Sequence, residues 1–176
     1  MSAGVNDKKD SLPNRRDPQE VAVRVAAHAD LGALVRFAAL FRDHSQRTRP
    51  SAEEFRSGIA RLLDDPGTEF LLALDESGAP LGFAQLRFRF SAWLAGNAAE
   101  VEDLYVLREA RRHGVGRRLM ELAIDRARGR SCQMIGLNTN ERNGPALALY
   151  EGLGFGAASA FWKGGRRLWL QRSLEP

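Results

Sequence analysis

The densest cluster of residues that could do chemistry is a basic, glycine-bearing stretch near the middle of the chain. Residues 111–117 read Arg-Arg-His-Gly-Val-Gly-Arg, directly after an apolar segment and before an amphipathic one. Glycine lets a ligand approach the backbone closely. The first turn of a helix presents unpaired N–H groups and the positive end of the helix dipole. A strand that runs through such a loop into a helix would therefore make a phosphate site.

The spacing of the glycines narrows the kind of phosphate ligand. A Walker A loop requires Gly-Lys-Ser/Thr, whereas Gly116 is followed by Arg117 and Arg118. A dinucleotide fingerprint requires a third glycine where Leu119 stands. Neither motif fits, and two glycines alone are equally consistent with a helix start whose arginines only face solvent.

Two neighbouring carboxylates, Glu102 and Asp103, lie within the apolar segment that precedes this loop. A carboxylate in the centre of a strand needs a partner or a function, because its burial costs free energy. Side chains alternate along a strand, so we expect Glu102 to share one face with Leu104 and Val106. Asp103 should then share the opposite face with Tyr105. A catalytic proton acceptor and an ion pair with one of the many arginines are both consistent with this position.

The elements that must carry these residues follow from hydrophobic periodicity and turn signals. Asp30 fits a helix N-cap, and Ser51 with Glu54 forms a capping box. We expect strands at 21–26, 70–74, 81–90, 100–107 and 132–137, a loop at 91–97, helices at 30–44, 51–65, 114–128 and 143–151, and a closing hairpin made of 155–162 and 167–174. This order predicts one mixed α/β sheet.

Two motifs in this order resemble those of the GNAT superfamily of acyl-CoA-dependent N-acetyltransferases. The first joins 101–106, Val-Glu-Asp-Leu-Tyr-Val, to Arg111-x-x-Gly114-x-Gly116. The second runs Leu137-Asn138-Thr139-Asn140-x-x-Asn143-x-x-Ala146-x-x-Leu149-Tyr150-Glu151-x-Leu153-Gly154-Phe155. The resemblance implies an α/β fold with a single mixed, mostly antiparallel sheet flanked by about four helices. We expect an N-acetyltransferase domain at 20–176 behind a polar, flexible tail at 1–19.

The resemblance also implies acetyl-CoA as the co-substrate and transfer of its acetyl group to a primary amine. The backbone of 111–116 would hold the pyrophosphate, and that of Leu104 and Val106 would pair with the pantetheine arm. Asn143 resembles the family's pantetheine contact, and Tyr150 its general acid to the leaving thiolate, with core packing as the alternative for Tyr150. The full set expected to bind acetyl-CoA is Leu104, Tyr105, Val106, Arg111, Arg112, His113, Gly114, Val115, Gly116, Arg117, Asn138, Asn143, Ala146 and Tyr150.

The segment 93–106 is similar to the diamine and polyamine acetyltransferase branch of this superfamily. By that similarity Glu102 is the leading base or amine anchor, with Asp103 and Glu100 as second choices. Trp93 would either wall the acceptor pocket or cap the core. The residues expected to bind the acceptor are therefore Trp93, Glu102 and Asp103.

The arginines near the expected acceptor pocket argue against a strongly cationic acceptor. A polyamine pocket should be rich in carboxylates. The segments that would line it instead bring mostly arginines and one carboxylate: Arg42, Asp43, Arg47, Arg49, Arg87 and Arg89. An acceptor that carries a carboxylate stays open, as do small amines, antibiotics and proteins.

Composition excludes several other classes. The 176 residues are 44% hydrophobic with a net charge of +4, which suits one globular domain. The single cysteine, Cys132, excludes an intramolecular disulfide and fits a reducing cytoplasm. We expect no signal peptide, because residues 1–20 are polar, and no membrane span, because no apolar run is long enough. The histidines and Cys132 show no metal-ligand spacing. Its scattered charges argue against nucleic acid. A non-catalytic acyl-CoA-binding module and a homodimer stay open.

Overall fold

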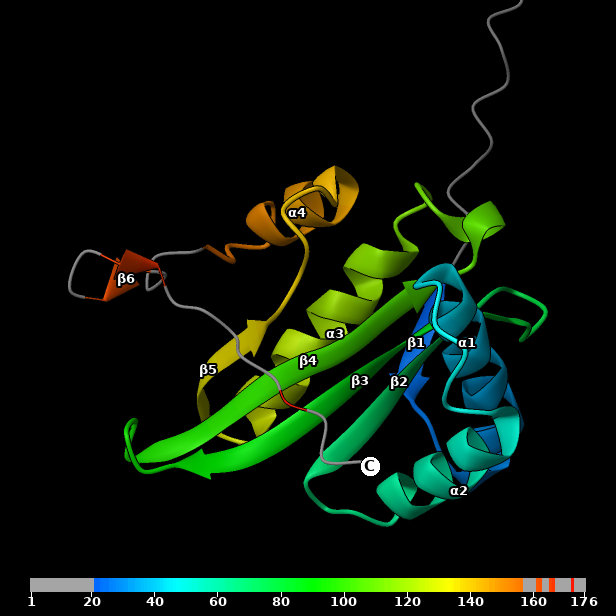
Figure 1. Cartoon of the computed structure of the whole chain (residues 1–176), viewed down its shortest axis with the longest axis horizontal. Helices are drawn as coiled ribbons and strands as arrows, with labels where there is room; N and C mark the ends of the chain where they lie inside the picture. The colour runs from blue at the N-terminus through cyan, green and yellow to red at the C-terminus, as the bar shows by residue number, and fades with distance from the viewer. Residues whose placement is uncertain (1–20, 157–160, 163–164, 167–171, 173–176) are drawn as a thin grey trace, which may run out of the picture.

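A five-stranded sheet in the order β1-β2-β3-β4-β5 forms the framework of the computed structural model, which describes residues 21–156, 161–162, 165–166 and 172 (Figure 1). Neighbouring strands are antiparallel except β4 and β5, which are parallel. The strands are β1 (Ala22–Val25), β2 (Thr68–Leu74), β3 (Pro80–Ser91), β4 (Gly96–Val106) and β5 (Cys132–Leu137). The expected mixed, mostly antiparallel sheet is confirmed.

Four α-helices flank this sheet in the described part of the chain, joined by two 3-10 turns. The helices are α1 (Leu31–His44), α2 (Ala52–Leu63), α3 (Val115–Gly129) and α4 (Gly144–Glu151); the turns are η1 (His28–Asp30) and η2 (Arg108–Ala110). The predicted capping box is confirmed at α2, where Ser51 accepts from the Glu54 amide and the Glu54 carboxylate accepts from the Ser51 amide. Asp30 is the N-cap of α1, but its carboxylate bonds to Arg24 and to the Ala27 amide instead.

The alternating side chains of the sheet build two apolar cores, one on each face. In β2, Phe70 and Leu72 pack with α1 and α2, whereas Leu71 and Ala73 pack with α3. Figure 1 shows the corresponding layers, with α3 and the pair α1–α2 on different faces of the sheet. The sheet is therefore buried on both sides where these helices cover it.

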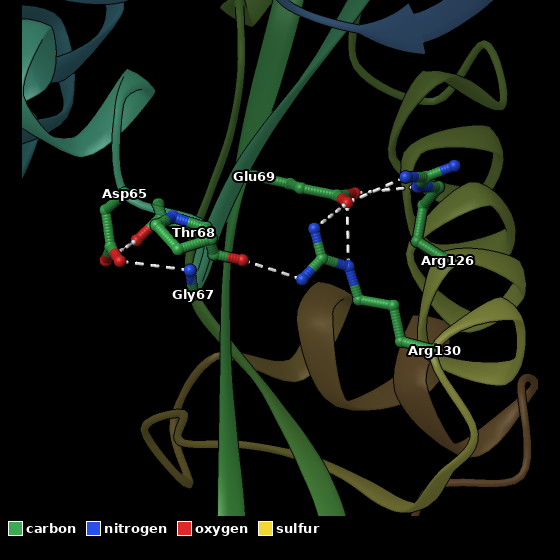
Figure 2. Close-up of polar contacts among 7 residues, drawn as sticks. Asp65, Gly67, Thr68, Glu69, Arg126 and Arg130 are labelled. Carbon is green, nitrogen blue, oxygen red and sulfur yellow. Dashed lines mark hydrogen bonds and ion pairs between the residues drawn. The ribbon is translucent and has the colours of Figure 1, made fainter.

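A buried carboxylate fixes the C-terminal end of α3 to the sheet. The Glu69 side chain, in β2, is 6% exposed and accepts from Arg126 and Arg130 at 2.7 Å each (Figure 2). Arg130 also donates to the Pro66 carbonyl and lies 4.2 Å over the ring of Phe88. Burial alone would raise the pKa of Glu69, but the two guanidinium groups lower it below its ordinary value. The carboxylate therefore stays charged and holds α3 in place.

A β-bulge in β4 changes which way its carboxylates point. Gln85 of β3 pairs with Asp103, but the next residue, Leu86, pairs with Val101, so Glu102 is an extra residue. The Glu102 carboxylate accepts from the Gln85 side chain. Asp103 lines a cavity together with residues of α1 and α2. Both carboxylates thus lie on the α1–α2 face, and the expectation that they face opposite sides is wrong.

The bulge also separates Glu102 from its expected neighbours on the strand. Leu104 and Val106 pack in the core on the α3 face, as does Val101 before the bulge. The simple alternation that placed Glu102 with Leu104 and Val106 fails because the extra residue shifts the pleat by one position.

The strands β4 and β5 pair over only part of their length. Their register ends at Val101 and Leu137, while β4 continues to Val106 against β3. Figure 1 shows β4 extending beyond the end of β5, where the chain turns toward α4. The last residues of β4 therefore have an open edge.

Several expected strand limits need correction: β1 is shorter than expected, and β2 begins at Thr68. The β3–β4 turn occupies only residues 92–95, because β3 continues to Ser91 and β4 begins at Gly96. In the closing hairpin, 155–156 are not in a strand, and the described pairs join β6 (Phe161–Trp162) to β7 (Gly165–Arg166). Gly165, expected in the turn, is in β7. The remaining hairpin residues and the expected tail at 1–19 lie outside the described residues. Within the described ranges, no helix is long and apolar enough to cross a membrane.

Candidate active site

The glycine-bearing loop leads into α3 and leaves a run of backbone amides without partners. Gly114 is the N-cap of α3 with φ +82°, a left-handed conformation that glycine adopts without a steric penalty. Arg112 is also left-handed, with φ +69°. The first amide after the loop that bonds to the helix is that of Arg118, which donates to the Gly114 carbonyl at 3.0 Å. The preceding amides from 112 to 117 donate to no acceptor in the described chain.

This loop fits an anionic group. The free amides, the helix dipole and the nearby guanidinium groups all favour negative charge. Arg108, Arg112 and Arg118 form no ion pair with any described residue, and Arg117 is 3.8 Å from Glu121 at the surface. His113 is exposed, and Val115 is buried beneath the loop. The residues present therefore match the diphosphate of a CoA-type ligand.

The open edge of β4 lies next to this loop. The Leu107 amide donates to Leu81 of β3 at 2.9 Å, so by strand alternation the backbone groups of Leu104 and Val106 point the other way, to the open edge. The Val106 carbonyl there accepts from Arg111 Nε at 3.0 Å. An extended ligand would pair with this edge as an added strand.

Tyr105 differs from Leu104 and Val106 in that its backbone points to β3 and its side chain to α1. Its backbone pairs with Phe83 of β3. Its ring packs against Phe37, Phe41 and His44 of α1, with centroids 5.9 to 6.4 Å away, and Arg111 lies 5.6 Å above it. Tyr105 thus forms part of the wall on the α1 side rather than part of the open edge.

The helix α4 packs beside the loop and carries Tyr150. A Cβ at Gly116 would lie 3.4 Å from Leu149 of α4 and 3.8 Å from Val106. The start of α3, the end of β4 and α4 therefore meet at one place. Tyr150 is half-buried, its ring 6.1 Å from that of Phe155, and burial raises the pKa of its hydroxyl.

The other residues expected on this side lie around the entry to α4. Asn143 is its exposed N-cap, and Ala146 is half-buried in its first turn. Asn138 is exposed and donates to the Glu100 carboxylate at 3.2 Å. Asn138 therefore connects the segment after β5 to the acidic residues of β4.

The carboxylates of β4 form the acidic part of the site. Partial desolvation raises the pKa of Glu102, Arg87 lowers it, and the negative charges of Asp103 and Glu100 raise it further, with a net increase. Burial also raises the pKa of Asp103, against the opposing charge of Arg47. Sequence reasoning missed Gln85, which holds the Glu102 carboxylate. The signal was a lone amide in the apolar run of β3.

Two hollows lie on the α1–α2 face. A cavity of about 260 Å³ lies between Asp103 and the segment that joins α1 to α2, with Phe41 and Phe55 among its walls. A more open hollow of about 650 Å³ lies beside α2, with Asp65 and Arg87 among its lining residues. The smaller cavity is the candidate site for a substrate, because it contains Asp103, next to Glu102 in the bulge.

Trp93 does not lie in this site. It is in the β3–β4 turn, 98% exposed, and the described chain builds neither a pocket nor a core around it. The two expectations for Trp93, walling the acceptor pocket or capping the core, are both wrong for the chain by itself. The alternation of side chains along a strand and the composition of the turn do not determine how far the β3–β4 hairpin projects from the sheet, so they could not place Trp93.

Two alternative chemistries find no support in the described residues. No group of three or more metal-ligating side chains occurs there. Cys132 starts β5 opposite Asn97, at the end of that strand away from Leu137, and burial raises the pKa of its thiol. A raised thiol pKa disfavours the thiolate that a covalent mechanism would need.

Comparison with known proteins agrees with this arrangement. Over 110 residues the chain is 34% identical to the aminoglycoside N(6')-acetyltransferase type 1 of Klebsiella aerogenes. The aligned region covers 60% of this chain and 72% of that protein. Over 98 residues it is 31% identical to the aminoalkylphosphonate N-acetyltransferase of Salmonella typhimurium (strain LT2), and the aligned region covers 56% of this chain and 63% of that protein. A solved structure of a probable acetyltransferase superposes with a TM-score of 0.76 at 26% identity, covering 88% of this chain and 99% of that one.

The family model described as "Acetyltransferase (GNAT) family" matches residues 34–155. This range contains the glycine-bearing loop, the open edge of β4, the carboxylates of the bulge and Tyr150. With the amides of the loop unpaired and the fold shared with solved acetyltransferases, the chain belongs to the GNAT family of acetyltransferases, whose co-substrate is acetyl-CoA.

Proposed function

We propose that this acetyltransferase moves the acetyl group of acetyl-CoA to a primary amine by direct attack in a ternary complex. The observation that carries the proposal is the position of Glu102 and Asp103. The bulge turns both carboxylates to the α1–α2 face, at the point where β5 leaves β4 and the open edge begins. An amine held by these carboxylates would lie beside the edge that receives the co-substrate.

The two relatives described above support an amine acceptor. Their names, aminoglycoside and aminoalkylphosphonate N-acetyltransferase, both specify transfer to nitrogen. Their acceptors differ in charge, so they support the amine and leave the remainder of the acceptor open. Among the acceptors expected from sequence, the polyamines of the diamine branch are disfavoured by the arginines around the smaller cavity.

Glu102 is the proposed proton acceptor. An alkylammonium must lose a proton before its nitrogen can attack a thioester, and its ordinary pKa is near 10. A carboxylate with a raised pKa accepts that proton more readily than an ordinary one, directly or through water. Gln85 orients the carboxylate by donating to it. Asp103 shares the negative charge that holds the ammonium group before it is deprotonated.

Tyr150 is the proposed proton donor to the departing thiolate of CoA. Its raised pKa keeps the hydroxyl protonated at neutral pH. The half-buried hydroxyl donates to no side chain or carbonyl in the described chain, so it is available to a ligand at the end of α4. The backbone amide of Leu104 or Val106, which points to the open edge, would polarise the thioester carbonyl. Positioning by these groups supplies the rest of the rate enhancement.

The competing function is a non-catalytic acyl-CoA-binding module. Such a module needs the loop and the open edge but has no use for a proton acceptor or donor. The oriented Glu102 and the half-buried Tyr150 favour the enzyme.

The test is release of CoA thiol from acetyl-CoA in the presence of amines of different classes. The panel contains polyamines, amino acids, aminoglycosides and peptides, and acetyl-CoA binding is measured in the same samples. We expect amine-dependent CoA release and an N-acetylated product by mass spectrometry. Binding without release across the panel would favour the non-catalytic module. Absence of binding would contradict the proposed use of the loop.

A further inference from the structure

The cavity beside Asp103 contains charges of both signs. Asp103 enters it from β4, whereas Arg42, Arg47 and Arg49 enter from the end of α1 and the segment that follows. At about 260 Å³ it lies just below the size range of about 300 to 1,000 Å³ that is typical of ligand pockets. Its size therefore suits a small acceptor.

The three arginines differ in what they already bind. Arg42 donates to Asp43 and to the Pro50 carbonyl, each at 2.7 Å. Arg49 forms an ion pair with Glu54. The Arg47 guanidinium makes neither a hydrogen bond nor an ion pair with any residue that the structure describes. Arg47 is therefore the arginine whose donors are available to a ligand.

Arg47 and Asp103 face the same cavity without forming an ion pair within 4.0 Å. The charge of Arg47 lowers the pKa of Asp103, although burial raises it more, so the two groups interact across the cavity. Two opposite charges separated by open space form a two-point site for a ligand that carries both charges. The acidic point adjoins Glu102, where the amine must react.

We propose that the acceptor is a small amine that also bears a carboxylate. Its amino group lies at Asp103 and Glu102, and its carboxylate binds the guanidinium of Arg47. Arginine suits this role because its planar group donates two parallel hydrogen bonds to a carboxylate. This inference rests on the proposed function and specifies the acceptor of that same site.

The test compares acceptors that differ only by the carboxylate. The pairs are phenylalanine with phenethylamine, 4-aminobutyrate with propylamine, and lysine with cadaverine. We expect kcat/KM to be about tenfold or more higher for the acid of at least one pair, which is the usual size of a hydrogen bond to a charged group. In Arg47→Gln this ratio should fall about tenfold or more. Thermal unfolding of each variant checks that it is folded.

Arg36→Gln is the matched control. Arg36 is an exposed residue of α1 that does not line the cavity. Arg36→Gln changes the net charge by the same amount as Arg47→Gln, and it should preserve the ratio of kcat/KM between the acid and the amine of each pair. Higher kcat/KM for the amine of every pair, or a ratio unaffected by Arg47→Gln, would overturn the inference and leave amine acetylation intact. No turnover with any pair would also overturn it. Only the absence of CoA release across the wider panel of amines would overturn the proposed function as well.

Discussion

Among single residues, Glu102 and Tyr150 have pKa values raised by burial, with opposite consequences for their protons. A higher carboxylate pKa makes Glu102 a stronger base but delays its ionisation to a higher pH. A higher phenol pKa keeps the proton on Tyr150 over the whole neutral range. The shift thus favours proton acceptance by Glu102, whereas it leaves Tyr150 protonated but a weaker acid, so that donation depends on its placement next to the thiolate.

Replacing Tyr150 by phenylalanine removes the proposed donor and preserves the ring contact with Phe155. We expect kcat to fall about 100-fold, within the usual contribution of a general acid, with the Kd for acetyl-CoA unchanged. Steady-state kinetics and calorimetric titration measure the two quantities. Tyr105→Phe removes the only other tyrosine hydroxyl of the chain and should cost less. Equal losses in the two variants would contradict the assignment.

Replacing Glu102 by glutamine tests the proposed base through the pH dependence of kcat/KM. In the native enzyme, activity should be lost as pH falls through the raised pKa of Glu102, so the acid limb lies above the ordinary carboxylate range. Glu102→Gln should abolish that limb, because glutamine does not titrate. Glu76→Gln, in the β2–β3 turn, is the control and should keep the limb. An acid limb that persists in Glu102→Gln would assign it to another group.

At the level of elements, the start of α3 and the open edge of β4 form one ligand-binding unit. Gly116 lies where α3 meets α4, and the Arg111 side chain donates to the Val106 carbonyl. The left-handed Gly114 lets the chain turn into α3 with the amides of the loop unpaired.

Gly114→Ala tests this unit against a matched position. Gly78, in the β2–β3 turn, has the same φ of +82°, and a Cβ at either glycine would meet nothing within 4 Å. Both alanine variants should lose about 1 kcal/mol of unfolding free energy, because only the backbone conformation is strained. Gly114→Ala alone should weaken acetyl-CoA binding, measured by calorimetry. Equal affinities in the two variants would show that the loop does not hold the co-substrate.

On the scale of the whole molecule, α3 packs on the sheet along its length, with buried ion pairs at its C-terminal end and unpaired amides at its N-terminal end. Glu69 holds its C-terminal end through Arg126 and Arg130 (Figure 2). The N-terminal end lies about 20 Å away, from 15 residues at 1.5 Å per residue. The ion pairs of Glu69 and the unpaired amides of the loop therefore lie at opposite ends of the same helix.

Glu69→Gln should lower the free energy of unfolding by about 3 kcal/mol, because it leaves two guanidinium groups without their buried partner. Asp125→Asn is the control: it breaks only the exposed pair with Arg128 and should cost less than about 0.5 kcal/mol. Chemical denaturation measures both. Similar losses in the two variants would contradict the role of the buried carboxylate.

The contribution of Glu69 should also depend on pH. Because its pKa is lower in the folded chain than in the unfolded one, its stabilisation is fully present above the ordinary carboxylate pKa. It is lost as pH falls from about 4.5 through the folded pKa. The difference in unfolding free energy between native chain and Glu69→Gln should therefore shrink in acid. A difference that does not change with pH would exclude an ionised Glu69.

Local signals in the sequence determined most of the elements and the motifs of the ligand loop. The Ser51–Glu54 capping box, the limits of β5 and the glycine-rich start of α3 depend on contacts between residues close in the chain, and the structure confirms them. Hydrophobic periodicity likewise predicted one mixed sheet, which the structure confirms. It did not single out Phe37, which lies fully buried against Phe83.

Only the tertiary structure decided how the candidate site is assembled. The face of Glu102 depends on the register of β3 against β4, and the exposure of Trp93 depends on how far that hairpin projects. The meeting of Arg47 with Asp103 joins residues more than fifty positions apart through the packing of α1 and α2 on the sheet. Register and packing are set by the balance of many contacts distant in sequence, so no local pattern of residue types contains them.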